Sequence, residues 1–323
     1  MKRKISIVMC TYNGEHYLAR QLDTLLGQTY PIHEIIIQDD CSTDGTWKLL
    51  QCYATRDGRI RLFRNERRRG VNTNFFTAMQ RAEADYIAIS DQDDLWEPQK
   101  VERQMACIGG NLLCACRSKP FSACSLPVAY DPRRPNVHLV RLLYSSIPGH
   151  TMLFHRRLLE LLPPYDESLR TYYDVYLSLT AAANDGLVLC DEFLVSQRRH
   201  EQAITYTPAD PRRSPSAGNG LYILCWSLLH FRRVHPYQCQ YFQRRLRLME
   251  GIRADSPLFG DALQIIRLQS RVGLLPLLRL TRWHLKYRHH LFYVESRGGI
   301  VNFGRALLYS TMQTYNYRYL TEI

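Results

Sequence analysis

The sequence predicts an α/β protein, in which a doubly wound, mainly parallel sheet is followed by a C-terminal helical extension. Short β-branched runs alternate with stretches of helical periodicity through the first half of the chain. Acidic residues follow two of these runs directly, at the strand ends where such sheets bind ligands. Beyond a Pro- and Ser-rich stretch, the rest of the chain shows amphipathic helical patterns rich in Arg.

The alternation can be followed element by element through the first 90 residues. Apolar or β-branched runs predict buried strands, and apolar residues at spacings of three and four predict the helices between them. Ser42, Thr43 and Asp44 offer capping side chains for the second helix. The expected strands cover 5–9, 34–38, 60–63 and 86–90, and the expected helices cover 15–26, 47–53 and 72–82.

The pattern is less regular further on. Residues 117–135 break into Pro, Ser and Arg, which indicates a loop, whereas 151–154 is typical of a strand. A helix is expected over 174–183 and one or two short strands over 186–195. The composition of 209–220 indicates a linker, so we expect an α/β domain over 1–206 and a basic, mostly helical region over 207–323.

Charge separates the same two regions. The 323 residues carry a formal net charge of +12, but 17 Lys and Arg against 6 Asp and Glu lie beyond residue 206. Residues 1–206 are therefore almost neutral, and residues 207–323 could bind a polyanion or an anionic membrane surface. The ten cysteines fit no common zinc pattern and are interpreted as reduced, buried thiols.

The sequence also bears on location. The opening MKRK runs straight into a strand-like ISIVMC, which argues against a signal peptide. The apolar runs 221–231 and 272–285 are too short or too charged to span a bilayer. We expect a cytoplasmic protein, with peripheral contact at the inner face of the cytoplasmic membrane suggested by the basic rear. Residues 231–248 interleave Arg with aromatics, which suits either an interfacial helix or a bundle packed on the domain over 1–206.

The segment SDQDDLW at 90–96 places Asp91, Asp93 and Asp94 at the mouth of a buried strand. Carboxylates this close repel one another, and they stay ionised only if a positive group lies among them. A divalent cation, Mg²⁺ or Mn²⁺, prefers such oxygen ligands and often shares them with substrate phosphates. The alternative is structural, since Asp93 or Asp94 could cap the helix that Pro98 helps to start.

Three further segments accompany this one: CTYNGEHYL at 10–18, QDDCSTDGT at 38–46 and RRGVNTNFFTA at 68–78. Their order and spacing resemble the family 2 glycosyltransferases, which have the GT-A fold. The resemblance covers about residues 4–200, and SDQDDLW looks most like the bacterial rhamnosyltransferases. It implies a metal-dependent, inverting hexosyl- or rhamnosyltransferase that takes a nucleotide-sugar donor.

The resemblance also implies roles for individual residues. Thr11 and Tyr12 would line the base pocket, Asp40 would bind the pyrimidine edge, and Asp93 would hold the metal. In the motif LVSQRRH, Arg198 and His200 match the family pattern, whereas Gln197 and Arg199 depart from it. The remaining residues expected to contact the nucleotide-sugar are Arg69, Asn74, Asp91, Arg198 and His200.

The transfer also needs a base, because a sugar hydroxyl is a poor nucleophile until a carboxylate takes its proton. In the family this base is an Asp that opens a late helix, and Asp174 in RTYYDVYL matches that position. Its structural alternative is an acidic residue favoured by the helix dipole, and Asp166 and Glu167 are fallback bases. His150, in PGHTMLF, matches the acceptor side and is expected to contact the acceptor.

The expected acceptor is a saccharide, and the basic rear suggests a lipid-linked one used in cell-surface polysaccharide synthesis. Two other classes compete with this reading. A sugar nucleotidyltransferase needs a Gly-rich phosphate loop after the first strand, where this chain has a single Gly. A non-catalytic nucleic-acid-binding protein would suit the net charge, but no RNA- or DNA-binding motif accompanies it, so we expect no nucleic-acid partner.

Overall fold

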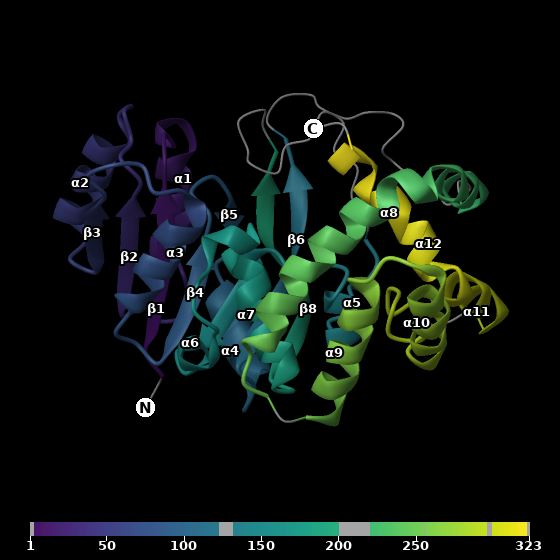
Figure 1. The fold of residues 1–323 in the computed structure, drawn as a ribbon. Coiled ribbons are helices and arrows are strands. Elements are labelled where there is room, and N and C mark those ends of the chain that lie inside the picture. The colour runs from purple at the N-terminus through teal and green to yellow at the C-terminus, as the bar shows by residue number, and fades with distance from the viewer. Residues whose placement is uncertain (1–2, 123–131, 200–219, 255, 296–298, 322–323) are drawn as a thin grey trace.

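The protein is built on one eight-stranded mixed sheet with helices on both faces and a helical layer at one side (Figure 1). The structure is a computed structural model that describes all residues except 1–2, 123–131, 200–219, 255, 296–298 and 322–323. The strands follow the order β3-β2-β1-β4-β7-β6-β8-β5. Their bounds are β1 Ile5–Thr11, β2 Glu34–Asp39, β3 Ile60–Arg64, β4 Tyr86–Ser90, β5 Leu95–Trp96, β6 Leu113–Phe121, β7 Met152–His155 and β8 Leu187–Arg198.

The predicted doubly wound, mainly parallel sheet is confirmed. Strands β3, β2, β1 and β4 pair in parallel, as do β6 and β8, while β7 runs antiparallel between β4 and β6. All five residues of β4 are buried, which explains why its sequence is a continuous apolar run rather than an alternation. Because the parallel strands end at one edge, the loops after β1, β2 and β4 meet there.

The helices of the first 200 residues cover both faces of the sheet. Leu18, Leu22 and Leu25 of the first helix pack with Ile5 and Ile7 on one face. Phe75 and Met79 pack on the other face. The bounds are α1 Glu15–Leu26, α2 Thr46–Arg56, α3 Val71–Gln80, α4 Lys100–Ile108, α5 Leu139–Leu142, α6 Leu158–Leu161 and α7 Tyr173–Ala183.

Two local predictions need correction. The expected loop over 117–135 is wrong at its start, because β6 continues to Phe121, beside β8. The one or two short strands expected over 186–195 are a single strand, β8, of 12 residues. Pairing with the neighbouring strand overrides the Pro and Ser that make 117–122 look irregular from sequence.

The C-terminal helices pack on the face of the sheet that carries α3 and α7. Phe242 and Met249 of the long helix α8 are buried in the same apolar cluster as Phe75 and Leu177. The predicted boundary at 206 falls outside the described residues and stays a prediction. The bounds are α8 Gly220–Glu250, α9 Pro257–Gln269, α10 Leu274–Lys286, α11 Gly299–Leu307 and α12 Tyr309–Gln313.

This packing decides between the two alternatives that the sequence allowed for 231–248, an interfacial helix or a packed bundle. Its residues Val234, Gln238, Phe242 and Arg245 are buried within the protein. The apolar side of this part of α8 is therefore not available to a bilayer, and the packed-bundle alternative is confirmed for it. None of the helices among the described residues combines the length and apolar character that crossing a membrane requires.

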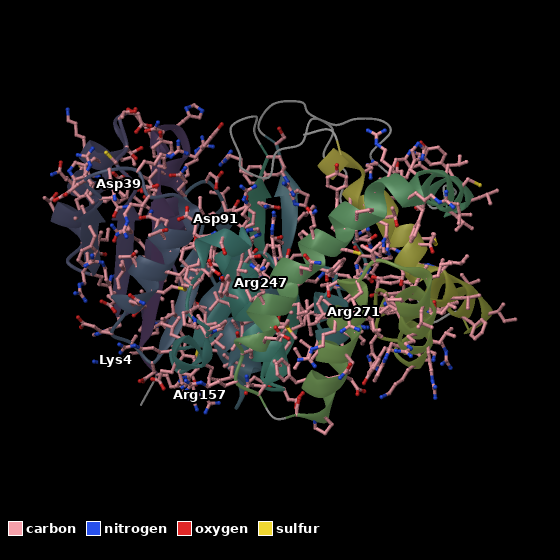
Figure 2. All side chains as sticks on the ribbon, in the orientation of Figure 1. Lys4, Asp39, Asp91, Arg157, Arg247 and Arg271 are labelled. Carbon is pink, nitrogen blue, oxygen red and sulfur yellow. The ribbon has the colours of Figure 1, made fainter. Side chains whose placement is uncertain are left out.

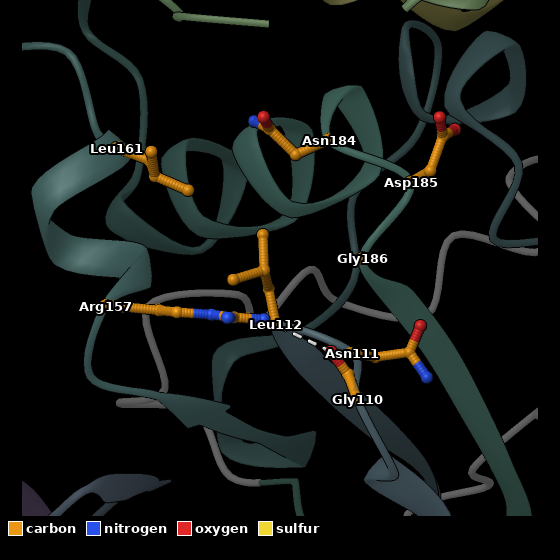
Figure 3. A pocket seen from close by; sticks show the side chains of 8 residues that line it. All are labelled: Gly110, Asn111, Leu112, Arg157, Leu161, Asn184, Asp185 and Gly186. Atoms are coloured by element: carbon orange, nitrogen blue, oxygen red, sulfur yellow. Dashed lines mark hydrogen bonds between the residues drawn. The ribbon is translucent and has the colours of Figure 1, made fainter.

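Labelled charged residues mark the two opposite edges of the sheet. Figure 2 shows Asp39 and Asp91 toward one edge, with Lys4 and Arg157 toward the other. A cavity of about 330 Å³ opens near Arg157, far from Asp91, and its lining is shown in Figure 3. Because it lies at the edge opposite the acidic loop, this cavity is separate from the candidate site. It is lined by Gly110, Asn111, Leu112, Arg157, Leu161, Asn184, Asp185 and Gly186.

Candidate active site

The acidic loop begins where buried β4 ends, and two of its carboxylates meet different surroundings. The side chain of Asp91 is 37% exposed, whereas that of Asp94 is 2% exposed. The backbone amide of Arg198 donates to Asp94 Oδ1 over 3.0 Å, and Arg198 Nε donates to the carbonyl oxygen of Asp93 over 2.9 Å. The end of β8 therefore holds this loop in place.

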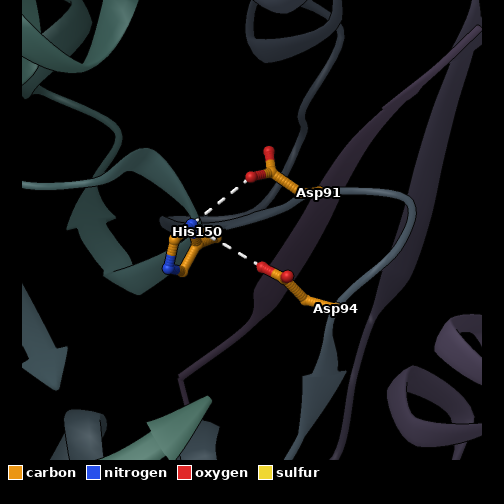
Figure 4. A group of neighbouring side chains, drawn as sticks. All are labelled: Asp91, Asp94 and His150. Carbon is orange, nitrogen blue, oxygen red and sulfur yellow. Dashed lines mark ion pairs between the residues drawn. The ribbon is translucent and has the colours of Figure 1, made fainter. Parts of the chain in front are cut away.

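His150 completes a compact group with two of these carboxylates (Figure 4). It lies in the 3-10 turn Gly149–Thr151 that leads into β7, the antiparallel neighbour of β4. Its Nδ1 is 3.3 Å from Asp91 Oδ2 and 3.6 Å from Asp94 Oδ2. Among the described residues, the buried atoms Asp94 Oδ2 and His150 Nε2 have no hydrogen-bond partner.

Burial and mutual repulsion shape the charges of this group. Burial raises the pKa of Asp94 to about 7, the charges of Asp91 and Asp93 push it the same way, and His150 opposes them. Burial alone would lower the pKa of His150, but the carboxylates of Asp94 and Asp91 outweigh it and raise that pKa. Asp94 and His150 therefore each favour the charged form of the other.

The donor set fits a hard divalent cation. Within the described part of the chain, Asp91, Asp94 and His150 form the one group of three such side chains whose ligand atoms lie within 4.8 Å of one another. An orphaned, buried carboxylate oxygen is what a cation would satisfy. Asp93, the ligand expected from the family resemblance, is not in this group, and its predicted role stays a prediction. The capping alternative is wrong, because α4 has Gln99 at its N-cap and no side-chain cap.

Arg198 is almost fully buried beside the acidic loop. Its guanidinium carbon lies 4.7 Å from the ring centroid of Tyr17 and 4.6 Å from that of Phe121. This stacking and the contacts to the loop make Arg198 a residue that positions Asp93 and Asp94. Its predicted contact with the nucleotide-sugar stays a prediction, and His200 lies outside the described residues.

Asp174 opens α7 next to this loop, as expected. Burial raises its pKa to about 6, with Asp91 adding to the shift and Arg245 and His150 opposing it. The helix start is fixed by Asn72, whose Oδ1 accepts from the backbone amide of Tyr173 over 2.9 Å. A carboxyl with such a pKa is ionised at neutral pH yet remains a better proton acceptor than an ordinary Asp. The fallback residues Asp166 and Glu167 are both exposed.

Thr11 and Tyr12 lie at the end of β1, beside the acidic loop. Thr11 is buried and donates to Asp39 Oδ1 over 2.9 Å. The amide of Gln92 pairs with the backbone of Tyr12, accepting from its N at 2.9 Å and donating to its O at 3.1 Å. A Cβ on Gly14 would force this amide to shift.

Asp40, Arg69 and Asn74, which are predicted to contact the nucleotide, form one network. Asp40 Oδ1 accepts from the backbone amide of Arg69 over 2.7 Å, and its Oδ2 accepts from that of Gly70 over 2.9 Å. Asn65 Nδ2 donates to Asp40 Oδ1 and to Asn74 Oδ1 over 2.8 and 2.9 Å. Each residue thus has a structural role in the loop after β3, and the predicted nucleotide contacts stay predictions.

Sequence reasoning missed three residues here: Gln92, Tyr173 and Lys100. Lys100 is fully buried, its Nζ lies 3.6 Å from the ring centroid of Trp96, and burial lowers its pKa to about 8. Tyr173 stacks on Phe75, and its hydroxyl would collide with a Cβ on Gly149. No pattern signals Lys100, because a Lys at the start of a helix is normally solvated.

The comparisons with known proteins agree with this geometry. The family model described as glycosyl transferase family 2 matches residues 6–159, which include β1, the acidic loop and His150. The chain contains a family 2 glycosyltransferase domain. The relatives that it resembles in sequence support the assignment, and the region with Asp174 and the C-terminal helices lies beyond the matched residues.

Two curated relatives illustrate the likeness. One is TuaG of Bacillus subtilis, which carries the name of a teichuronic acid biosynthesis glycosyltransferase and is 38% identical over 104 residues. The other is WfgD of Escherichia coli, a UDP-Glc:alpha-D-GlcNAc-diphosphoundecaprenol beta-1,3-glucosyltransferase, 37% identical over 103 residues. Each match covers 32% of this chain, and it spans only 41% of TuaG and 40% of WfgD.

Solved structures extend the likeness over the whole fold. TarS residues 1–349 of S. aureus, in complex with UDP-GlcNAc, align over 99% of this chain and 90% of that one, with a TM-score of 0.59 and 17% identity. The mannosyltransferase PcManGT of Pyrobaculum calidifontis, with GDP-Man and Mn²⁺, aligns over 98% and 85%, with a TM-score of 0.54 and 16% identity. At these identities the likeness concerns the fold, which is of the GT-A type.

Proposed function

We propose that the protein is an inverting glycosyltransferase that moves a sugar from a nucleotide-diphosphate donor to a saccharide acceptor. One observation supports the proposal most strongly. A set of side chains suited to bind a cation lies at the same edge of the sheet as a carboxylate with a raised pKa. Asp91, Asp94 and His150 supply the first, and Asp174 supplies the second. Donor and acceptor would meet between them.

The reaction requires one proton transfer and one displacement. As the acceptor oxygen attacks the anomeric carbon, Asp174 takes the proton of the acceptor hydroxyl. The new carbon–oxygen bond forms while the bond from the anomeric carbon to the diphosphate oxygen breaks, and the nucleoside diphosphate leaves with that electron pair. Attack from the face opposite the leaving group inverts the anomeric configuration. Tyr173, which precedes Asp174, is buried and stacks on Phe75.

A divalent cation would be held by Asp91, Asp94 and His150, and it would neutralise the charge that develops on the departing diphosphate. Arg198 positions the loop that carries two of these ligands through its bonds to Asp94 and to the Asp93 carbonyl. Thr11, Tyr12, Asp40 and the residues bonded to it would form the wall that receives the nucleotide.

The acceptor that we infer is a lipid-linked saccharide in cell-surface polysaccharide synthesis. WfgD is named for a diphosphoundecaprenol-linked acceptor, and TuaG for teichuronic acid biosynthesis. The basic C-terminal region of this chain suits work near an anionic membrane. A hexose or rhamnose donor is consistent with the same family, and the protein would act on the cytoplasmic side.

A thermal-shift screen of nucleotide-sugars, each with and without Mn²⁺, tests the proposal. We expect a cognate donor to raise the Tm only when Mn²⁺ is present, since the metal joins the carboxylates to the diphosphate. The configuration of the product, read by NMR with the donor found in this way, tests inversion. Binding of no nucleotide-sugar under any metal condition would contradict the proposed function, and retention of configuration would contradict the mechanism.

A further inference from the structure

Exposed apolar side chains gather on the C-terminal helices. Of the 15 large hydrophobic residues that are exposed within the described part of the chain, 13 lie in 220–323. They include members of both apolar runs that the sequence marks out as too short or too charged to span a bilayer. The largest concentrations outside α8 are on α10 and α11, with Val272 just before α10.

Helix α10 has one face in the protein and one in solvent. Leu280 and His284 are buried, and His284 Nε2 lies 2.7 Å from the hydroxyl oxygen of Tyr144. On the solvent side, Leu274 and Leu278 are 76% and 70% exposed.

The same solvent-facing stripe continues into basic residues. Positions 274, 278, 282 and 286 repeat every four residues and hold Leu, Leu, Arg and Lys, while Leu275 and Arg279 repeat the pattern beside them. The first half of the helix is therefore apolar outside, and the second half is cationic. None of the ion pairs that the structure describes involves Arg279 or Arg282, while Lys286 pairs with Asp261.

Helix α11 packs beside α10 (Figure 1). It buries Asn302 and Ala306, and it leaves Ile300 at 91% and Val301 at 65% exposure. Neither helix contains an Asp or a Glu. We define the membrane-facing surface as the exposed residues Leu274, Leu275, Leu278, Arg279, Arg282, Ile300 and Val301.

We propose that this surface docks on a bilayer containing anionic lipid. Aliphatic side chains at the headgroup boundary, next to arginines and without carboxylates, match a membrane that is apolar below and negative at its surface. Charge of a single sign favours a lipid surface over a protein partner. The inference rests on the proposed function, because a lipid-linked acceptor would be presented at that membrane, and it assigns the contact to α10 and α11 rather than to 231–248.

Vesicle flotation at low salt tests the surface directly, with phosphatidylcholine vesicles that contain or lack phosphatidylglycerol. We expect the full chain to float with the anionic vesicles only. The double variant Arg279→Gln with Arg282→Gln should bind them roughly 30-fold more weakly, because each arginine near the surface contributes about 1 kcal/mol. Leu274→Glu with Leu278→Glu should also lose binding, because it puts two carboxylates on the inserted stripe.

The matched control is Arg20→Gln with Arg56→Gln, which changes net charge equally on the exposed sides of α1 and α2, far from this surface. It should float like the unaltered protein. Equal binding by all variants, or no binding to anionic vesicles, overturns the proposal. Self-association would also overturn the proposal. In that case, light scattering would show an association that Leu274→Glu with Leu278→Glu abolishes, while flotation of this variant persists.

Donor binding separates this inference from the proposed function. A protein that responds to a nucleotide-sugar with Mn²⁺ but ignores every vesicle refutes the surface alone. Conversely, vesicle binding without any donor response refutes the glycosyltransferase proposal and leaves the surface standing. The thermal shift of each surface variant with its donor also confirms that the variant is folded.

Discussion

Replacing Asp174 with Asn should remove most of the turnover and, at the same time, stabilise the folded protein at neutral pH. A positioned general base contributes roughly 100- to 10,000-fold, so turnover should fall within that range while donor binding survives. The gain in stability has a separate cause. Burial raises the pKa of the Asp174 carboxyl from 3.8 to about 6, which means that the fold disfavours its ionised form.

The size and sign of the effect follow from that shift. One pKa unit corresponds to about 1.4 kcal/mol, so ionised Asp174 costs the fold about 3 kcal/mol. The carboxyl's contribution to stability is fully present below its unfolded pKa and is lost as the pH rises through about 6. The neutral Asn avoids this loss. The variant should exceed the unaltered protein by about 3 kcal/mol near pH 8, and by about half of that near pH 5.

Urea unfolding of both proteins at these two pH values measures the difference, and initial rates across the same range measure catalysis. For the unaltered protein, kcat/KM should fall on the acid side with an apparent pKa of about 6. Asp166→Asn is the matched control, because Asp166 is exposed and caps a 3-10 turn. Near-normal turnover in Asp174→Asn, or a loss of turnover confined to Asp166→Asn, would show that the base lies elsewhere. A difference in the free energy of unfolding that does not change with pH would refute the raised pKa of Asp174.

Three other changes test the neighbouring features. Asp94→Asn and His150→Ala should each weaken Mn²⁺ binding at least tenfold in calorimetry of the protein without donor, whereas an unchanged affinity would remove them from the metal site. Arg198→Lys keeps the charge but loses the planar guanidinium that stacks on Tyr17 and bonds the Asp93 carbonyl. Urea unfolding should therefore show that the free energy of unfolding falls by about 1–3 kcal/mol, and an unchanged value would contradict the positioning role. Phe242→Ala should cost about 3–5 kcal/mol and lower a single unfolding transition, because α8 shares the core of the sheet, and two separate transitions would contradict that view.

The order of elements in the first half was predictable because the sheet is buried on both faces. Runs such as Ile35–Ile37 leave few alternatives, and the observed β2, Glu34–Asp39, differs from the prediction by one residue. The start of 117–135 was not predictable. Pro120 lies near the end of β6, paired only with the parallel strand β8, where a missing amide is tolerated.

Some residues of the candidate site could likewise be predicted from the sequence, and others could not. Local motifs pointed to Asp91, Asp174 and the loops at the strand ends, because parallel strands deliver their loops to one edge. The partnership of Asp94 with His150 depends on β7 lying antiparallel beside β4, and that pairing joins residues far apart in sequence. No local pattern records such a contact. The burial of Arg198 between Tyr17 and Phe121 was hidden for the same reason.

The long helix α8 has a consequence for how this protein can be divided. Its buried Arg245 donates to the carbonyl oxygens of Leu142 and Leu143, and its positive charge lowers the pKa of Asp174 against the effect of burial. Ending the chain before α8 would expose apolar side chains on one side of the sheet, and it would remove a cation that lowers the pKa of Asp174. The smallest fragment that keeps the proposed activity should therefore include α8.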